Sequence, residues 1–160
     1  MKKIILATLA LMLFASAAAA QTATAQDPQA LRALFHRWGY QPEPVSMTDG
    51  HPLIRMNVDG VATVVGVGGC TDGRACTYIV LIAVYDDVVN PPFEWLNAQN
   101  NDYDLVTATR SDEGMLSLRT GITLGTAGIP EATLRAALAD WVAANNEIAQ
   151  RAVQAGLARE

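Results

Sequence analysis

The stretch CTYIVLIAVY, residues 76–85, is apolar or aromatic at every position after Thr77. A strand with one solvated face usually alternates apolar and polar residues, whereas an unbroken apolar run is typical of a central strand covered on both faces. Either helices cover both faces of such a sheet, or a partner chain covers one of them. The fold therefore depends on the segments on either side of this strand.

Two further strands are expected directly before it. Residues 53–58, LIRMNV, alternate as a half-buried strand, and residues 61–67, VATVVGV, follow as its partner. Asp59-Gly60 between them is a strong hairpin signal, because the favoured two-residue turn needs positive φ at both positions. Residues 40–52, YQPEPVSMTDGHP, are predicted to form a loop from their prolines and glycine.

A first helix is expected upstream of this loop. Asp27 is a candidate N-cap and Pro28 suits the first helical position, while Gly39 is a stop signal. The apolar residues between them recur at the spacing of one helix face. They are Leu31, Leu34, Phe35 and Trp38.

The second half of the chain adds a short helix and two strands. Asp86-Asp87 is expected to end the apolar strand, and Asn90 to cap a helix over residues 90–101. Residues 104–110 and 115–120 are predicted strands joined by the turn Ser-Asp-Glu-Gly. Residues 121–130 are predicted to form a loop.

Pro130 opens a predicted long helix, whose apolar stripe Asn145 interrupts. The stripe consists of Leu134, Leu138, Trp141, Val142, Ile148 and Val153. The complete order is α-β-β-β-α-β-β-α. It predicts an α+β fold, an antiparallel sheet flanked by helices.

Residues 1–20 have the pattern of an export signal. Lys2 and Lys3 precede an apolar segment, and three alanines before Gln21 suit a cleavage site. We expect a mature chain that is periplasmic or secreted, with a flexible leader at residues 21–26 and one domain at residues 27–157. No later segment is apolar enough for membrane insertion of the mature chain.

The expected mature chain is acidic. Loss of the two lysines leaves nine of the eleven basic residues against sixteen acids, a net charge of −7. Nucleic acids and anionic membranes are bound through clustered Lys and Arg. The composition therefore argues against both as partners.

Cys70 and Cys76 are the only cysteines, and a disulfide between neighbouring strand ends is the simplest interpretation. A zinc site would need four ligands, and only His36 and His51 could add soft or imidazole donors. Thr71 stands where a G-x-G-x-x-G phosphate loop needs its last glycine, and no Walker motif occurs. We therefore expect no metal and no cofactor.

Catalytic residues are not evident either. His36 is expected on a helix surface and His51 in a turn, and no serine lies in a G-x-S-x-G elbow. The acidic pairs lie at predicted element ends, where they shape turns and caps. The chain is therefore expected not to be an enzyme, although a histidine beside an acid and a nucleophile would change that.

The short helix carries the candidate interaction surface. Phe93 and Trp95 lie on opposite sides of it, so one of them is expected to be exposed as a contact residue. Asn97 and Asn100 on the same helix complete the candidate surface.

Residues 91–124, together with RWGY at the end of the first helix, resemble the YbjN-like family over residues 28–150. The matching positions are Asn97, Asn100, Asp112, Gly114, Leu116 and Leu118. The chain departs from the family pattern after Asn100, where the usual Arg-aromatic character is missing. The resemblance implies a domain similar to the type III secretion chaperone-like fold and a role in sensory transduction regulation. It implies no reaction.

These observations predict an exported, non-enzymatic module that binds a protein partner, or itself as a homodimer, through a sheet face or helix groove. The alternative is a periplasmic carrier of a small apolar ligand, held between the sheet and the long helix. Gly66 and Gly68 would then lie in the strand that forms the pocket floor.

Overall fold

The computed structural model describes residues 21–159, so the expected signal peptide lies outside the described residues. The α+β class and the order of the main elements are confirmed, with three short strands added. The elements are β1 (Thr22–Ala23), α1 (Pro28–Arg37), β2 (Ser46–Thr48), β3 (His51–Val58), β4 (Val61–Gly68), β5 (Tyr78–Val89), α2 (Phe93–Asp102), β6 (Thr107–Arg110), β7 (Met115–Thr123), β8 (Ile129–Pro130) and α3 (Glu131–Gln154).

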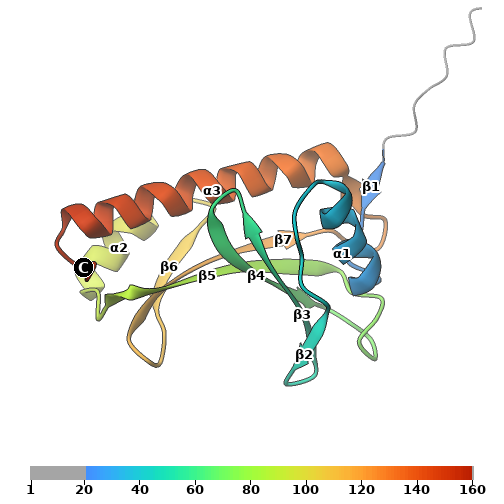
Figure 1. Ribbon diagram of the computed structural model, residues 1–160, viewed down its shortest axis with the longest axis horizontal. Coiled ribbons are helices and arrows are strands. Elements are labelled where there is room, and N and C mark those ends of the chain that lie inside the picture. The colour runs from blue at the N-terminus through green and yellow to red at the C-terminus, as the bar shows by residue number, and fades with distance from the viewer. Residues whose placement is uncertain (1–20, 160) are drawn as a thin grey trace, which may run out of the picture.

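Six strands form an antiparallel sheet in the order β2-β3-β4-β5-β7-β6, and β1 pairs with β8 in a separate two-stranded sheet. The apolar strand β5 is central, as predicted. Figure 1 shows α3 running along one face of the six-stranded sheet, with α1 near one end and α2 near the other. The β2–β3 and β6–β7 turns point away from α3. The helices therefore cover one face of β5, not both.

The local signals around α1 and the β3–β4 hairpin are confirmed. The Asp27 side chain accepts a hydrogen bond from the backbone N–H of Gln29 at 2.9 Å, which satisfies a free donor of the first helical turn. Asp59 and Gly60 have φ of 47° and 99°, so both lie in the left-handed region that the tight turn requires.

Residues 40–52 are not a loop throughout. Ser46–Thr48 forms β2, which pairs with the start of β3 across Asp49 and Gly50. These two residues have φ of 50° and 80°, so the Asp-Gly signal makes a second hairpin here. His51, expected in a turn, is instead the first residue of β3.

The expected flexible leader is packed against the domain. Ala23 pairs with Ile129 in the β1–β8 sheet and is fully buried, as is Ala25. The backbone N–H of Glu131 donates to the Gln21 carbonyl at 2.8 Å. Small side chains allow this close approach, and a Cβ at Gly128 would lie 2.5 Å from the Ala23 carbonyl oxygen.

The second half differs from the sequence-based boundaries in several places. Residues 121–130 are not a loop throughout, because β7 continues to Thr123 and Ile129–Pro130 forms β8. Strand β5 continues past Asp86 to Val89 through an irregularity in its pairing with β7. Strand β6 begins at Thr107 rather than at residue 104. Asn90 does not cap α2, because its φ is 52° and its N–H donates to the Gly114 carbonyl at 2.7 Å. Pro92 takes the N-cap position without a side-chain hydrogen bond.

The core lies between the sheet and α3. Side chains from alternate positions of the central strands pack there with the stripe of α3, and they include Ile54, Val65, Ile79, Leu81, Leu116, Leu118, Leu134, Leu138, Trp141 and Ile148. In the described range, 21–159, no helix has the length and apolar character needed to span a bilayer.

Two polar contacts fix α3 on the sheet. Trp141 Nε1 donates a hydrogen bond to Thr63 Oγ1 on β4 at 3.1 Å. The Tyr85 hydroxyl on β5 donates to Asn145 Oδ1 at 3.1 Å, and Asn145 Nδ2 donates to the Trp141 carbonyl at 2.8 Å. Asn145 therefore does not interrupt the packing of α3, because it is fully buried with both amide atoms bonded.

Candidate functional site

The face of the six-stranded sheet opposite α3 is apolar and is not covered by any described helix. We call it the outer face. Side chains alternate along a strand, so on β5 Ile79 and Leu81 are fully buried while Tyr78 and Val84, on the other face, are 42% and 48% exposed. The central residues of the outer face are Leu53, Arg55, Val64, Gly66, Gly68, Tyr78, Val80, Ile82, Val84, Arg119 and Gly121.

The strand register arranges these residues in rows across the sheet. One row runs from Arg55 through Val64 and Ile82 to Arg119. Neighbouring strands lie about 4.8 Å apart, so three strand spacings separate the two arginine backbones by roughly 14 Å. Two cations therefore flank an apolar pair.

The next row is the floor of a trough. It runs from Leu53 through Gly66 and Val80 to Gly121. Glycine has no side chain, so this row is lower than the arginine row beside it. A shallow hollow of about 200 Å³ opens here, lined by His51, Gly66, Val67, Gly68, Tyr78, Val80, Ile82 and Arg119.

The central residues of the outer face include two arginines and no acid. Within the described residues, neither Arg55 nor Arg119 takes part in an ion pair. Arg55 Nη1 donates to Ser46 Oγ at 3.3 Å, which leaves its charge uncompensated. No Asp or Glu occurs among the central residues of the face, although acids outnumber bases in the whole chain.

The ring of Tyr78 lies over Gly68. A Cβ at Gly68 would come within 2.3 Å of Tyr78 Cζ, so the glycine provides the space for the ring. An aromatic ring commonly covers a strand glycine in this way. Gly68 therefore has a packing role in the sheet.

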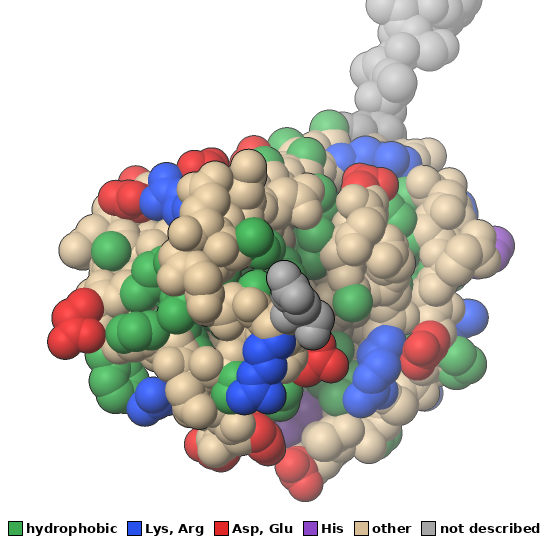
Figure 2. All heavy atoms as spheres, turned by 60° about the vertical axis from the view of Figure 1, so that its left-hand side comes forward, with side chains coloured by type: hydrophobic (Ala, Val, Ile, Leu, Met, Phe, Trp, Pro, Cys, Tyr) green, Lys and Arg blue, Asp and Glu red, His purple; other side chains and the backbone are tan. Residues whose placement is uncertain are grey.

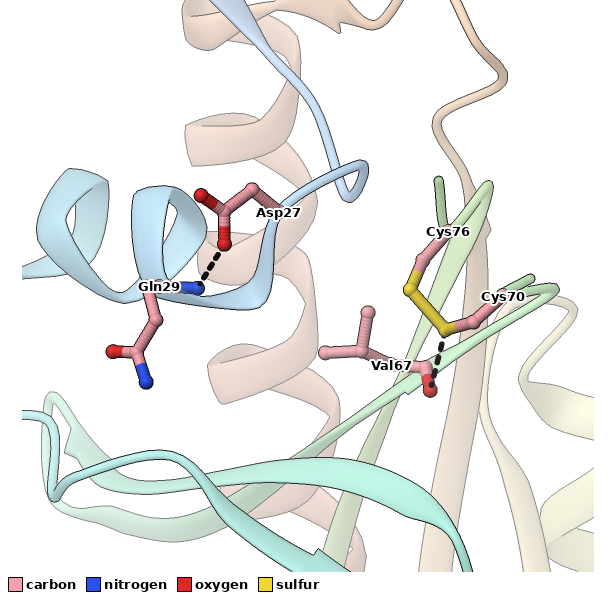
Figure 3. The surroundings of a disulfide bond; sticks show 5 residues. All are labelled: Asp27, Gln29, Val67, Cys70 and Cys76. Atoms are coloured by element: carbon pink, nitrogen blue, oxygen red, sulfur yellow. Dashed lines mark hydrogen bonds between the residues drawn. A yellow bond between two sulfur atoms is a disulfide. The ribbon is translucent and has the colours of Figure 1, made fainter. Parts of the chain in front are cut away.

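The disulfide joins Cys70 and Cys76 at the ends of β4 and β5 (Figure 3). Cys70 Sγ lies 3.7 Å from the Val67 carbonyl oxygen; we interpret this as a packing contact, because a disulfide sulfur carries no hydrogen. The backbone N–H of Ala75 inside the closed loop donates to the Gln26 carbonyl at 2.8 Å. The loop that the disulfide closes is thus hydrogen-bonded to the N-terminal segment.

The four residues of the candidate surface on α2 do not lie in one common environment. Phe93 is 62% exposed, and the Arg110 guanidinium lies 4.3 Å from the centroid of its ring. Trp95 is half-buried and packs against the core, whereas Asn97 is exposed.

The Asn100 side chain binds the backbone of strand β6. Its Nδ2 donates to the Ala108 carbonyl at 3.0 Å, and its Oδ1 accepts from the Ala108 N–H at 2.7 Å. Ala108 lies in β6, an edge strand of the sheet. The amide therefore occupies backbone groups that would otherwise be open at this edge.

Phe93 lies together with residues of the β6–β7 turn around an open hollow of about 440 Å³. Gly114 ends that turn with φ of 85°, and a Cβ there would lie 2.6 Å from Asn90 Oδ1. Gly114 is therefore required by the geometry of the turn. The hollow is lined by Asn90, Phe93, Arg110, Ser111, Asp112, Glu113 and Gly114.

A cleft of about 450 Å³ lies between α3 and β7. Its apolar lining includes Leu105, Val106, Ile122, Ala137, Trp141 and Ala144, and its rim carries Asp102, Asp104, Asp140 and Glu147. Arg151 pairs with Asp102 and, at 2.9 Å, with Glu147. The nearby Tyr103 hydroxyl and then the Arg151 guanidinium lower the pKa of Glu147.

The histidines do not form a catalytic arrangement. Neither His36 on α1 nor His51 on β3 makes a side-chain hydrogen bond or ion pair with another described residue. Over residues 21–159, no three His, Cys, Asp or Glu side chains come close enough to bind a metal ion together.

Sequence reasoning missed the two arginines of the outer face. Their alignment follows from strand pairing, and only the β3–β4 part could be read locally. Because the Asp59-Gly60 hairpin sets the register, Arg55 must lie opposite Val64. The position of Arg119 depends on a long-range pairing of β5 with β7 and carries no local signal.

Charged groups elsewhere on the surface are dispersed. Figure 2, which turns the α2 end of the molecule forward, shows acidic and basic side chains scattered among apolar ones, in several places next to each other. On this side of the molecule they do not gather into a basic stripe.

The sequence matches the family model YbjN, described as "Putative bacterial sensory transduction regulator", over residues 27–152. No curated protein and no solved structure matches the chain.

Proposed function

The chain belongs to the YbjN family, and on that premise we propose that it is an exported, non-enzymatic regulatory module that binds another protein through the outer face. The family description supports a regulatory or interaction role. The observation that carries the proposal is the outer face itself. The exposed side chains of Tyr78 and Val84 lie in line with Val80 and Ile82 along β5, and α3 covers this strand only from the other side. Large apolar patches of this kind are typical of protein interaction sites.

Export is supported by residues 1–20 and by the cysteines. The N-terminal segment has the charged start, apolar stretch and small residues of an export signal. A structural disulfide such as Cys70–Cys76 persists in oxidising compartments, including the periplasm. We therefore propose a periplasmic or secreted location for the mature chain.

The remaining parts of the proposal rest on the sequence and on geometry. The long helix over an antiparallel sheet agrees with the secretion-chaperone-like fold that the resemblance implies. The acidic composition supports a protein partner rather than nucleic acid. Neither His36 nor His51 forms an ion pair with a described acid, which supports a role without catalysis.

The test is site-specific photo-crosslinking of the mature chain in cells. A crosslinking amino acid at Ile82 probes the outer face, and the same group at the exposed Ala139 of α3 is the matched control. We expect a discrete crosslinked protein product from position 82 and none from position 139. Equal crosslinking from both positions, or none from position 82, would contradict the use of this face.

The cleft between α3 and β7 favours a second candidate, a carrier of a small apolar ligand. Its volume of about 450 Å³ lies in the range of small-molecule sites. The floor differs from the expectation, since Gly121 of β7 lines the cleft and Gly66 and Gly68 do not. Mass spectrometry of the native mature protein should then detect a bound small molecule. The variant Ala144→Trp fills the cleft and should abolish this binding. A ligand-free spectrum under native conditions would argue against it.

A further inference from the structure

We propose that the occupant of the outer face is an amphipathic helix of a partner protein, with carboxylates along both sides of its apolar stripe. This inference rests on the proposed function, because it names the partner chemistry of the same face. It follows from three features: the closed edges of the sheet, the spacing of two arginines, and the absence of acids between them.

The edges of the sheet disfavour a partner that adds a strand. At one edge, the Asn100 amide already bonds the outward N–H and C=O of Ala108 at 2.7 and 3.0 Å. At the other edge, β2 is only three residues long and offers few backbone groups. Short or occupied edges prevent β-augmentation, so a partner must lie on the face instead.

The dimensions of the outer face suit a helix. The backbones of Arg55 and Arg119 are separated by three strand spacings, or roughly 14 Å. An α-helix with its side chains is about 10 to 12 Å wide, so it fits between the two arginines. Its apolar stripe would contact Val64 and Ile82, and Gly66 on β4 in the adjacent row would accept a larger side chain.

The charge of Arg55 and Arg119 favours an acidic partner helix. The Arg55 and Arg119 guanidinium groups have no acidic partner among the described residues, and the central residues of the face include no carboxylate. A partner helix with Glu or Asp on both flanks would supply one carboxylate to each cation. A two-fold dimer through the same face would instead place these cations together without an acid between them. We therefore favour a different protein over a second copy of this chain.

The experiment compares two designed peptides of about five helical turns, each with one leucine-rich stripe. One has Glu on both flanks of the stripe and the other has Lys. Binding to the oxidised mature chain is measured by fluorescence anisotropy of labelled peptide. We expect the Glu peptide to bind at least about tenfold more tightly than its Lys twin, with the preference falling as salt screens the charges.

Variants of Arg55 and Arg119 test whether these residues cause the preference for the Glu peptide. Arg119→Glu and Arg55→Glu should each weaken binding of the Glu peptide by about tenfold, while the neutral Arg119→Gln should weaken it less. The matched control is Arg74→Glu, because Arg74 is an exposed arginine in the disulfide loop and outside the outer face. It should leave the affinity unchanged. Circular dichroism and the unfolding midpoint confirm that each variant is folded.

The outcomes separate this inference from the proposed function. Equal affinity for the two peptides, or no effect of Arg119→Glu in a folded variant, would overturn the acidic-helix inference. If position 82 still crosslinks a partner in cells, the proposed function would survive that failure. Sedimentation could instead show a concentration-dependent dimer that Val84→Glu abolishes. A second copy of the chain would then occupy the outer face, and the inference would be overturned. Binding of the chain to anionic vesicles through Arg55 and Arg119 would overturn it as well.

Discussion

The two faces of strand β5 are almost equally apolar, yet α3 covers only one of them. Ile79 and Leu81 on the inner face are fully buried, while Tyr78 and Val84 on the outer face remain well exposed. Hydrophobicity alone therefore does not explain which face the helix takes. The difference lies in the polar groups that each face offers.

The inner face contains hydrogen-bond partners at two points along α3. Thr63 accepts from Trp141, and Tyr85 donates to Asn145, so the helix is fixed in both position and rotation. A buried polar group that lost its partner would raise the free energy of the folded state, which disfavours other placements of α3. The outer face instead provides two arginines that form no ion pair with a described residue. The inner face thus binds the chain's own helix α3, and the outer face remains open to a helix of another protein.

Truncation of a large side chain should lower the free energy of unfolding far more on the inner face than on the outer face. We expect Trp141→Ala to lower the free energy of unfolding by about 3 to 5 kcal/mol, since it leaves a cavity and removes the hydrogen bond to Thr63. Val84→Ala on the outer face should cost less than about 1 kcal/mol, because its side chain is half exposed in the folded state. Urea unfolding of both variants measures the difference. Similar losses would mean that the outer face is also covered in the isolated protein.

The disulfide should have the next largest effect, and it should act on both faces alike. In the chain-entropy model, closing a loop of this length contributes about 2.4 kcal/mol to stability. The double variant Cys70→Ser/Cys76→Ser should lose about that amount in denaturant unfolding, while crosslinking from position 82 is retained. Addition of reductant should destabilise the parent chain and leave the variant unaffected. A variant as stable as the oxidised parent would show that the bridge does not stabilise the fold.

Titration of Tyr85 should give the smallest effect and should report on the inner face alone. Burial, and then the nearby Asp87 carboxylate, raise the pKa of Tyr85 from 10.0 to about 12. Because the folded value lies above the unfolded one, this contribution to stability is complete below pH 10 and is lost as the pH rises to 12. The part of the alkaline stability loss that belongs to this hydroxyl should therefore disappear in Tyr85→Phe.

The same variant also loses the bond to Asn145, so its stability at neutral pH should be lower than that of the parent. Urea unfolding across the alkaline range, with the ultraviolet absorbance of tyrosinate, measures both effects. An unchanged pH profile in Tyr85→Phe would show that another group titrates there.

Elements set by local chemistry could be predicted from the sequence. Asp27 and Pro28 start α1 because a cap and a fixed φ act within one turn. Asp59-Gly60 forms the β3–β4 turn because both residues tolerate positive φ. The disulfide pairing followed for the same reason, since Cys70 and Cys76 are six positions apart at the ends of paired strands.

Features that depend on distant partners could not be predicted in this way. Asn145 resembled an interruption of the α3 stripe, because its partner Tyr85 lies 60 positions earlier in the chain. Asn100 resembled a contact residue, because nothing in its own helix indicates a bond to the backbone of β6. The two arginines of the outer face likewise become a pair only when β5 joins β4 to β7.

The pairing of β1 with β8 also sets an order of events during synthesis. Thr22 and Ala23 leave the ribosome early, but their partners Ile129 and Pro130 are among the later residues to emerge. Until then the segment ahead of α1 has no strand to join. Once β8 arrives, the backbone there is hydrogen-bonded and Ala23 is enclosed. Closure of this small sheet therefore has to wait for residues that directly precede α3.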